Sequence, residues 1–589
     1  MIAFVSSAIF VFSMIITIAL FLMLPKANAP RRESFLLWLA ISIVSFYCYE
    51  AFAGGIANLA GIPINLFTLT AINTIASVLM LLHIRRHKQI QQYVITWYDV
   101  TGLLLLFVGI IYFCVFRYGT ALIPTYETSD PGTHLKMAVY LVKEGQLSEM
   151  YFGPLFNAIH IMLLKPLFDF PNHYKAFILS DMLAFALSGL VFLALIQALL
   201  KGWPMKIAGL LFSIFYMLGY PLCNHLFGFS YLGIGVMLIS FLMLLMQVYL
   251  CGEHKNKLLV LLLMMSLYAL SVCYVLFIPF VAVALLATVT AKYISEKRLI
   301  TLEFVTTCVQ MFLLPFVLCL CYMLKFSHLM SGGSLAAEGY INRDLYTNFI
   351  MIAPVSLFGV LACYKKRQWF PSILAIAFFL YMLAMLFFTL KGSVSTYYFY
   401  KTHYVLWLLC FYLAVAGCAA LYETARGAMV SWGIITVAII GMAIGNVDGF
   451  LQERVYLVNP QDSANTRKLA QIYVLNQYYT ENVSVKYTDD DMALNSKGYE
   501  YANNPDTSIL PVFDWLDTFW FEAMTAQNYS NYYTWFVSDF EAYLKRIADD
   551  GFDYVAVRYA GEFYKNHADY FNQLERVYEN SVGFIAKYQ

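Results

Sequence analysis

The segment Thr125–Tyr174 reads TYETSDPGTHLKMAVYLVKEGQLSEMYFGPLFNAIHIMLLKPLFDFPNHY. It lies between two strongly apolar runs, 98–118 and 174–200. An apolar run of about 20 residues is long enough to cross the roughly 30 Å hydrocarbon core of a bilayer as a helix. The segment is therefore predicted to be a large loop between two membrane spans.

Apolar runs of this length recur along most of the chain. Of the 589 residues, 61% are hydrophobic and only 12% are charged, whereas soluble domains carry about 25% charged residues. This composition excludes an ordinary soluble enzyme and predicts a polytopic α-helical membrane protein. About fourteen transmembrane helices are predicted, near 2–24, 35–57, 64–84, 98–118, 174–200, 205–222, 231–250, 257–277, 279–296, 302–325, 349–364, 370–390, 404–422 and 428–447.

Lysine and arginine gather after every second predicted span. Short loops rich in these residues stay on the cytoplasmic side, so the pattern predicts that both termini and the long polar segments lie outside. The seven basic clusters are Lys26/Arg31/Arg32, Arg85/Arg86/Lys88, Lys201/Lys206, Lys255/Lys257, Lys297/Arg298, Lys365/Lys366/Arg367 and Arg426. The long outer segments are 118–173, 221–230, 327–348, 393–403 and the tail from about 448.

The tail differs in composition from the membrane part. Residues 451–589 contain 20 acidic and 11 basic residues, a balance of 11 − 20 = −9, and they are rich in aromatic residues, unlike disordered tails. A small extracytoplasmic α/β domain is predicted for 448–589. Its expected elements are helices at Ser463–Tyr479 and Ser538–Ala548, strands at Val483–Tyr487 and Tyr554–Arg558, and a hairpin of Glu575–Tyr578 with Gly583–Lys587.

The loop itself contains two predicted helices. Pro131 suits the first position of a helix, so Asp130 is the expected N-cap of a helix that runs to Glu144 and ends at Gly145. His134 then lies one turn beyond Asp130 on the same side. A second helix, near Pro154–Phe168, is short and is expected to lie in the outer membrane interface.

A large first outer loop with an acid at the start of a short amphipathic helix, followed by an aromatic-Pro-Leu segment, resembles the GT-C superfamily of glycosyltransferases. The matching residues are Asp130-Pro131-Gly132-Thr133-His134 and Tyr151-Phe152-Gly153-Pro154-Leu155. The resemblance implies a GT-C module at 98–447, with first outer loop 118–173, preceded by three additional helices in 1–97. It also implies a polyprenyl-phosphate sugar as donor and Asp130 as general base.

The residues are consistent with that chemistry. A sugar on a polyprenyl phosphate already has a good leaving group, so one carboxylate that deprotonates the acceptor suffices, and the departing phosphate needs positive charge. Asp130 and His134 are the predicted catalytic residues, and Lys401 is the first candidate for the phosphate. The predicted substrate-binding residues are Lys401, Tyr397, Tyr400, His403, Arg117, Lys165, Arg343 and His225.

No metal and no other cofactor are expected. The loop has Asp-Pro-Gly instead of the paired acids of metal-using members, and a single aspartate with scattered histidines makes a poor site for a hard cation. The eleven cysteines form no CxxC pair, and the chain contains no Walker motif and no GxGxxG after a strand. ATP-driven transport is therefore disfavoured.

Beside a purely structural membrane scaffold, three functional hypotheses remain open. The first is an inverting glycosyltransferase in a bacterial plasma membrane, which moves a sugar from a polyprenyl phosphate to a cell-envelope glycan, a lipid or a protein, with membrane lipids as further partners and no nucleic acid. The second is a polymerase or ligase of lipid-linked oligosaccharides. The third is a transporter or flippase of lipid-linked saccharides, which would predict charged or broken midplane helices and symmetric halves. Asp130 also has a simpler reading, as a helix cap alone.

Overall fold

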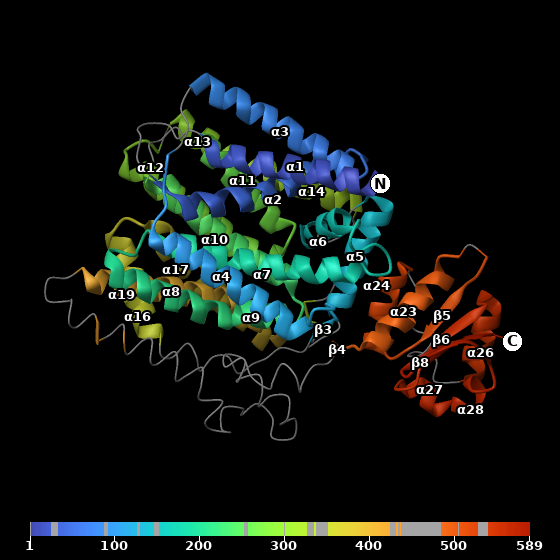
Figure 1. Cartoon of the computed structure of the whole chain (residues 1–589). Coiled ribbons are helices and arrows are strands. Elements are labelled where there is room, and N and C mark those ends of the chain that lie inside the picture. Colours follow the sequence, from blue (N-terminus) through green and yellow to red (C-terminus); the bar gives the residue numbers. More distant parts are fainter. Residues whose placement is uncertain are drawn as a thin grey trace.

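The structure is a computed structural model of the whole chain. It describes residues 2–24, 33–87, 92–126, 130–146, 152–251, 257–299, 301–326, 335–336, 352–423, 432–433, 436, 485–504, 506–527 and 540–588. These residues form a large helical bundle and a smaller C-terminal domain at one end of it (Figure 1).

Eleven segments of the bundle are long and apolar enough to cross a membrane, and each agrees with a predicted span. They are α1 (Ile2–Met23), α2 (Phe35–Leu59), α3 (Leu66–His87), α4 (Trp97–Tyr118), α7 (His173–Gln197), α8 (Gly202–Leu218) with α9 (Tyr220–Leu226), α10 (Ser230–Cys251), η1 (Val275–Phe277) with α12 (Ile278–Ser295), α13 (Leu302–Cys308) with η2 (Val309–Leu313) and α14 (Leu314–Phe326), α17 (Trp369–Leu390), and α18 (Thr396–Lys401) with α19 (His403–Tyr422).

The predicted count of fourteen spans is not confirmed. The run 257–277 is broken, because α11 (Lys257–Ser271) ends before η1 begins, and α16 (Ala353–Lys365) is also short. Apolar residues continue through the break after Ser271, so hydropathy alone does not reveal it. The fourteenth span, 428–447, lies almost wholly outside the described residues.

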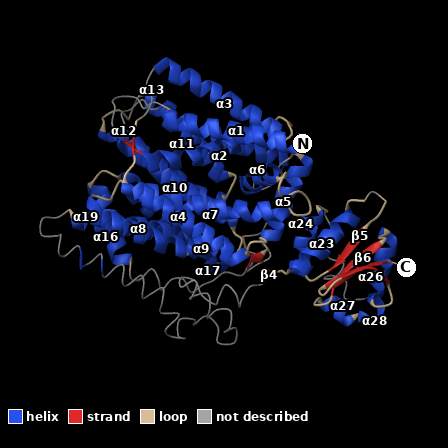
Figure 2. Cartoon of the chain, in the orientation of Figure 1, coloured by secondary structure: helices blue, strands red, loops and turns tan. Residues whose placement is uncertain are grey.

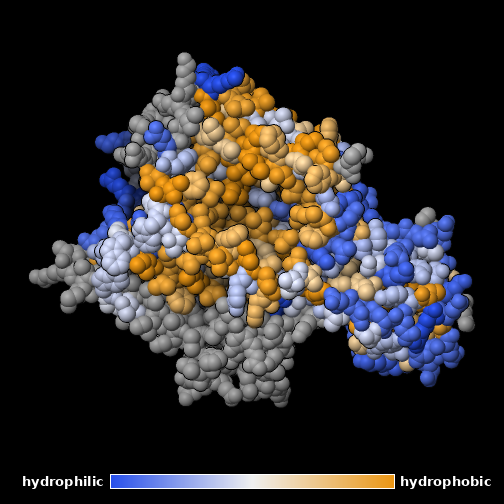
Figure 3. All heavy atoms as spheres, viewed as in Figure 1, coloured by the Kyte–Doolittle hydropathy of each residue, from blue (hydrophilic) through white to orange (hydrophobic). Residues whose placement is uncertain are grey.

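The centre of the bundle is formed by a few helices. In the most apolar 18-residue stretch of each helix, 83% of the residues are buried in α7 and 78% in α10, but only 22% in α4. Figure 3 shows a largely hydrophobic surface over the bundle and a hydrophilic surface over the C-terminal domain. Because a bilayer replaces water around apolar side chains, outward-facing residues on the peripheral helices can stay apolar.

Several of the predicted basic loops meet at one end of the bundle. Glu423 pairs with Lys201 at 2.8 Å and with Lys366 at 2.6 Å, although these lysines follow different helices. The short strands β1 (Glu33–Ser34) and β2 (Tyr93–Val94) pair in parallel, which joins the loops after α1 and α3. The start of α1 and the C-terminal domain lie towards the opposite end (Figure 1).

The C-terminal domain is a small α/β domain, as predicted (Figure 2). Its four strands are ordered β5-β6-β8-β7, with β5 and β6 parallel and the other pairs antiparallel. Its elements are α23 (Asp489–Ala502), β5 (Ile509–Val512), α24 (Trp515–Thr525), α26 (Phe540–Asp550), β6 (Tyr554–Arg558), α27 (Glu562–Asn566), α28 (Ala568–Phe571), β7 (Glu575–Glu579) and β8 (Gly583–Lys587).

Most tail elements agree with the sequence, but one strand has a different partner. The β6 bounds and the β7–β8 hairpin are confirmed, and the predicted helix Ser538–Ala548 is α26, shifted by two residues. The predicted strand Val483–Tyr487 is β4 (Val485–Lys486), which pairs antiparallel with β3 (Thr125–Tyr126) of the first loop. It therefore ties the domain to the bundle instead of joining the sheet. The predicted helix Ser463–Tyr479 lies outside the described residues.

The second helix of the first loop is embedded in the protein. The prediction placed it at the outer interface, but α6 (Phe152–Leu164) packs against α5 (Asp130–Glu144) and α7 and is buried along most of its length. Its apolar side chains cover more than one face, and Phe156 and Ile159 are each 1% exposed. An interfacial helix would expose a polar face, whereas His160 of α6 is buried and bonds Tyr47 at 3.0 Å.

Candidate active site

The first side of the site is the helix α5, whose bounds were predicted from its end residues. It begins at Asp130 and ends at Glu144, and Gly145 follows with φ of +67°. That backbone conformation favours glycine, and the Gly145 N–H donates to the Leu141 carbonyl at 2.8 Å. Since Leu135 and Ala138 are buried, α5 is fixed against the bundle and presents Asp130 from a defined position.

The second side of the site is the short helix α18, which carries Lys401. The Lys401 side chain is buried, at 3% exposure, and its Nζ donates to the Tyr231 hydroxyl at 2.6 Å. The same ammonium lies 4.1 Å from the Tyr397 ring centre and 5.0 Å from that of Phe229. Aromatic faces attract cations, and such faces surround the buried Lys401 amine on several sides.

Asp130 and Lys401 interact electrostatically although they are far apart in the sequence. Burial raises the pKa of the Asp130 carboxyl above its ordinary value, and the nearby Lys401 ammonium opposes that rise. A carboxylate with a raised pKa is a better proton acceptor than an ordinary one. The structure thus brings together the predicted base and the predicted phosphate-binding residue.

His134 joins this cluster, as its spacing from Asp130 suggested. Its ring lies 5.0 Å from the Tyr231 ring, centre to centre. Burial and the Lys401 charge lower the pKa of His134 to about 4, so the imidazole is neutral near pH 7. Its Nε2 atom is buried and has no hydrogen-bond partner among the described residues, which leaves a polar atom available in the cluster.

Two glycines lie where the surrounding segments meet the cluster. Gly228, between α9 and α10, has φ of +69°, and a Cβ there would lie 2.0 Å from the Pro131 ring. A Cβ at Gly153, in the second family-like motif, would lie 3.4 Å from Tyr231 Cβ. Both motifs of the first loop therefore meet at the start of α10, where Phe229 and Tyr231 are presented.

Two predicted substrate-binding residues belong to a neighbouring buried network. His225 bonds the Tyr118 hydroxyl at 2.8 Å, and Arg117 donates to the Thr125 carbonyl at 2.9 Å. Asp181 lies at the centre of this network. It accepts from the Ser230 hydroxyl at 2.6 Å and from the Tyr126 hydroxyl at 3.1 Å. Since Ser230 precedes Tyr231 in the chain, this network is directly linked to the cluster.

The remaining predicted residues have separate positions. His403 is buried and its Nδ1 bonds the Tyr400 carbonyl at 3.0 Å, which fixes the joint between α18 and α19. Lys165 is partly exposed, and its Nζ lies 3.8 Å from Asp169 Oδ1. This ion pair includes no residue of the cluster. Arg343 lies outside the described residues.

Sequence reasoning missed Tyr231 and Phe229, which with Tyr397 form the aromatic wall around Lys401. Phe229 lies at the end of the predicted outer segment Pro221–Ser230 and Tyr231 directly follows it, and that position was the one available signal. Within the described ranges, no group of three or more His, Cys, Asp or Glu side chains is placed to hold a metal ion. Metal independence remains a prediction.

Neither a protein-family model nor a curated protein sequence matches the chain. Among solved structures, ArnT from Cupriavidus metallidurans bound to undecaprenyl phosphate is similar over 83% of this chain and 98% of its own, with 14% identity and a TM-score of 0.50. The apo structure of that ArnT covers the same shares, with 15% identity and a TM-score of 0.49. AglB from Archaeoglobus fulgidus, in complex with an inhibitory peptide and a dolichol-phosphate, matches 94% of this chain and 69% of its own, with 12% identity and a TM-score of 0.28.

The likeness to ArnT bound to undecaprenyl phosphate bears on the fold. It extends over nearly the whole ArnT chain. The chain therefore has the fold of ArnT over most of its length.

Proposed function

We propose that this protein is an inverting glycosyltransferase that moves a sugar from a polyprenyl-phosphate donor to a hydroxyl of an extracytoplasmic acceptor. The acceptor is a cell-envelope glycan, a lipid or a protein, and the membrane is a bacterial plasma membrane. The observation that carries the proposal is the buried cluster in which Asp130 and Lys401 meet beside Tyr231 and Tyr397. The ArnT fold, solved with undecaprenyl phosphate, supports a lipid phosphate as the donor's carrier.

Asp130 acts as the general base in this proposal. Its carboxylate removes the proton from the acceptor hydroxyl as the acceptor oxygen bonds to the anomeric carbon of the sugar. The bond from that carbon to the phosphate oxygen breaks, and the polyprenyl phosphate leaves with the electron pair. Attack and departure on opposite faces of the sugar invert the anomeric configuration, by analogy with inverting hydrolases.

Lys401 binds the donor phosphate and stabilises the charge that grows on it. In the free protein its ammonium opposes the rise of the Asp130 pKa. A bound phosphate neutralises that ammonium, and removing a nearby positive charge raises the pKa of a carboxylate. Donor binding therefore makes Asp130 a stronger base. The pKa of His134 is about 4, so its imidazole is neutral near pH 7. A neutral imidazole nitrogen can accept a hydrogen bond from the acceptor hydroxyl.

The donor class gives the most direct test of the proposed reaction. Purified protein is incubated with a polyprenyl-phosphate sugar or with the corresponding nucleotide sugar, together with an envelope-lipid extract as the acceptor source. We expect transfer from the lipid-linked donor alone, with release of one polyprenyl phosphate for each sugar transferred. Transfer from the nucleotide sugar without a lipid intermediate would contradict the proposal.

A further inference from the structure

The C-terminal domain contacts the bundle chiefly through one helix. Figure 1 places α24 beside α5, and the two helices pack against each other. The carbonyl of Ala523 in α24 also accepts a hydrogen bond from His173 Nε2 at 2.9 Å, and Trp520 stacks on Tyr126 with ring centres 5.9 Å apart. The helix that carries Asp130 is thus covered by a helix from the far end of the chain.

The two faces of α5 have different partners. Successive residues of a helix are rotated by about 100°, so Gly132, Lys136 and Lys143 share one face. Asp130 and His134 lie on the opposite face, towards Tyr231 and Lys401. A displacement of the first face would therefore move Asp130 within the cluster.

The first face of α5 makes close contacts with α24. A Cβ at Gly132 would lie 3.1 Å from Phe519 Cβ, which shows how closely the backbones approach. One turn further, Lys136 Nζ pairs with Glu522 Oε2 at 2.7 Å, and the Glu522 side chain is fully buried. At the end of the helix, Lys143 Nζ donates to the Ala526 carbonyl at 2.8 Å.

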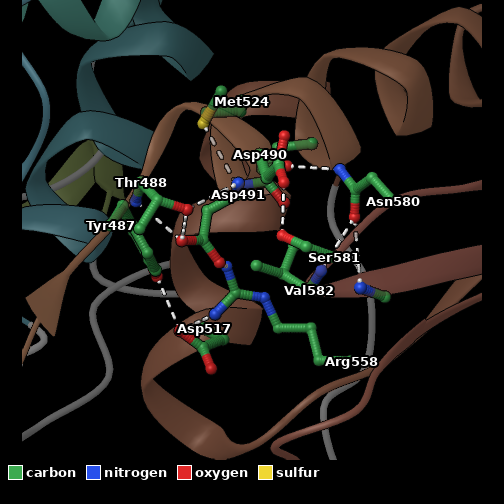
Figure 4. Close-up of polar contacts among 12 residues, drawn as sticks. Tyr487, Thr488, Asp490, Asp491, Asp517, Met524, Arg558, Asn580, Ser581 and Val582 are labelled. Carbon is green, nitrogen blue, oxygen red and sulfur yellow. Dashed lines mark hydrogen bonds and ion pairs between the residues drawn. The ribbon is translucent and has the colours of Figure 1, made fainter.

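On its other side, α24 is fixed to the sheet of its own domain (Figure 4). Arg558 of β6 pairs with Asp517 of α24 at 2.8 Å and also with Asp491 of α23. The Tyr487 hydroxyl donates to Asp517 at 2.8 Å. Because these contacts hold α24 against its own domain, a movement of α5 does not simply carry α24 with it. The helix α24 therefore acts as a fixed support for α5.

We propose that α24 is a positioning element of the candidate active site, in which Glu522, through Lys136, fixes the back of α5 and so the place of Asp130. The inference rests on the proposed function, and it assigns the C-terminal domain a part in turnover. Glu522 and Lys136 are positioning residues because they act through α5. Reaction rates depend steeply on such placement, and a shift of about 1 Å at a reacting group can cost about 100-fold.

The test compares Lys136→Met, which keeps length but removes the charge, with Lys136→Arg, which keeps the charge. The control is Glu500→Gln, which breaks an exposed ion pair with Lys497 on α23 of the same domain. For each full-length variant, kcat, the donor KM and hydrogen exchange of α5 backbone amides are measured. We expect Lys136→Met to lower kcat by about 10- to 100-fold, to leave the donor KM unchanged and to speed exchange in α5. Lys136→Arg and Glu500→Gln should resemble the unaltered protein.

Each outcome separates this inference from the proposed function. Exchange is measured without any substrate, so it reports on α5 even if the unaltered protein transfers no sugar, a result that would refute the proposed function alone. Unchanged exchange in α5, or a Lys136→Met enzyme with unaltered kcat, would overturn the positioning role. If Lys136→Met does not fold, Glu522→Gln replaces it, since it removes the carboxylate charge that pairs with Lys136 and keeps a side chain of the same size. Hydrogen exchange in α5 and kcat of that variant then test the positioning role in the same way.

Discussion

Replacing Asp130 with asparagine separates the two roles that this residue can have. Asparagine caps a helix about as well as aspartate, so α5 should keep its first turn. The carboxylate is lost, and with it the proton acceptor and the negative charge beside Lys401. A capping role therefore predicts almost no effect, whereas a catalytic role predicts a large one.

The size of the effect follows from the chemistry of the site. A positioned base contributes about 10²–10⁴-fold to a rate, which corresponds to about 3–5 kcal/mol in the barrier. Lys401 keeps its 2.6 Å bond to the Tyr231 hydroxyl and its contact with the Tyr397 ring. Folding should therefore persist. Donor affinity should not fall, because the Lys401 charge no longer faces a carboxylate.

The assay is single-turnover transfer from a labelled polyprenyl-phosphate sugar, with donor affinity and thermal stability measured on the same preparations. Asp169→Asn is the matched control, because Asp169 is an exposed acid of the same loop, 3.8 Å from Lys165. We expect the control to react at the unaltered rate and Asp130→Asn to bind donor without transferring it. If Asp130→Asn reacts within about threefold of the unaltered protein, far less than the loss of a general base would cause, Asp130 is only a cap.

Three other predictions concern the same cluster and the membrane orientation. Lys401→Ala should weaken donor binding as well as transfer, because the phosphate is charged in the ground state too; a loss of rate alone would contradict that role. The transfer rate should rise with pH through the raised pKa of Asp130, since a base acts when deprotonated, and the rise should move to higher pH in Lys401→Met, which lacks the opposing charge; a rate independent of pH in both would argue against a carboxylate base. In a chain without native cysteines, Asn504→Cys should react with a membrane-impermeant reagent on intact cells while Arg86→Cys is protected, as the basic loops predict; the reverse pattern would invert the orientation.

Metal dependence gives a further prediction. Transfer should survive EDTA, because the paired acids that a hard cation prefers are lacking in the loop around Asp130. Loss of activity in EDTA that Mg²⁺ or Mn²⁺ restores would show that ligands from other segments complete a metal site.

Local signals account for the parts of the structure that the sequence predicted well. The bounds of α5 follow from Asp130-Pro131 at one end and Gly145 at the other, because caps and breakers act within one turn. The strand Tyr554–Arg558 and the hairpin after it follow from short alternating runs and a turn. Eleven membrane spans follow from hydropathy, since lipid admits backbone only as helices or closed barrels.

The parts that were missed depend on contacts between distant segments. Nothing near Lys136 indicates that Glu522 will pair with it, and nothing in Val485–Lys486 indicates a partner strand in the first loop. Gly228 lets the segment that carries Tyr231 approach Pro131. Such contacts are fixed by packing of the whole bundle, which no local pattern of residue types records.

Binding of a lipid phosphate at the Asp130–Lys401 cluster can be seen in an experimental structure of the purified protein with undecaprenyl phosphate added. We expect the phosphate to lie within hydrogen-bond distance of Lys401 Nζ, close to Asp130, with the prenyl chain leading into the membrane. A lipid phosphate bound elsewhere, with Lys401 still bonded to Tyr231 and Asp130 unchanged, would contradict it.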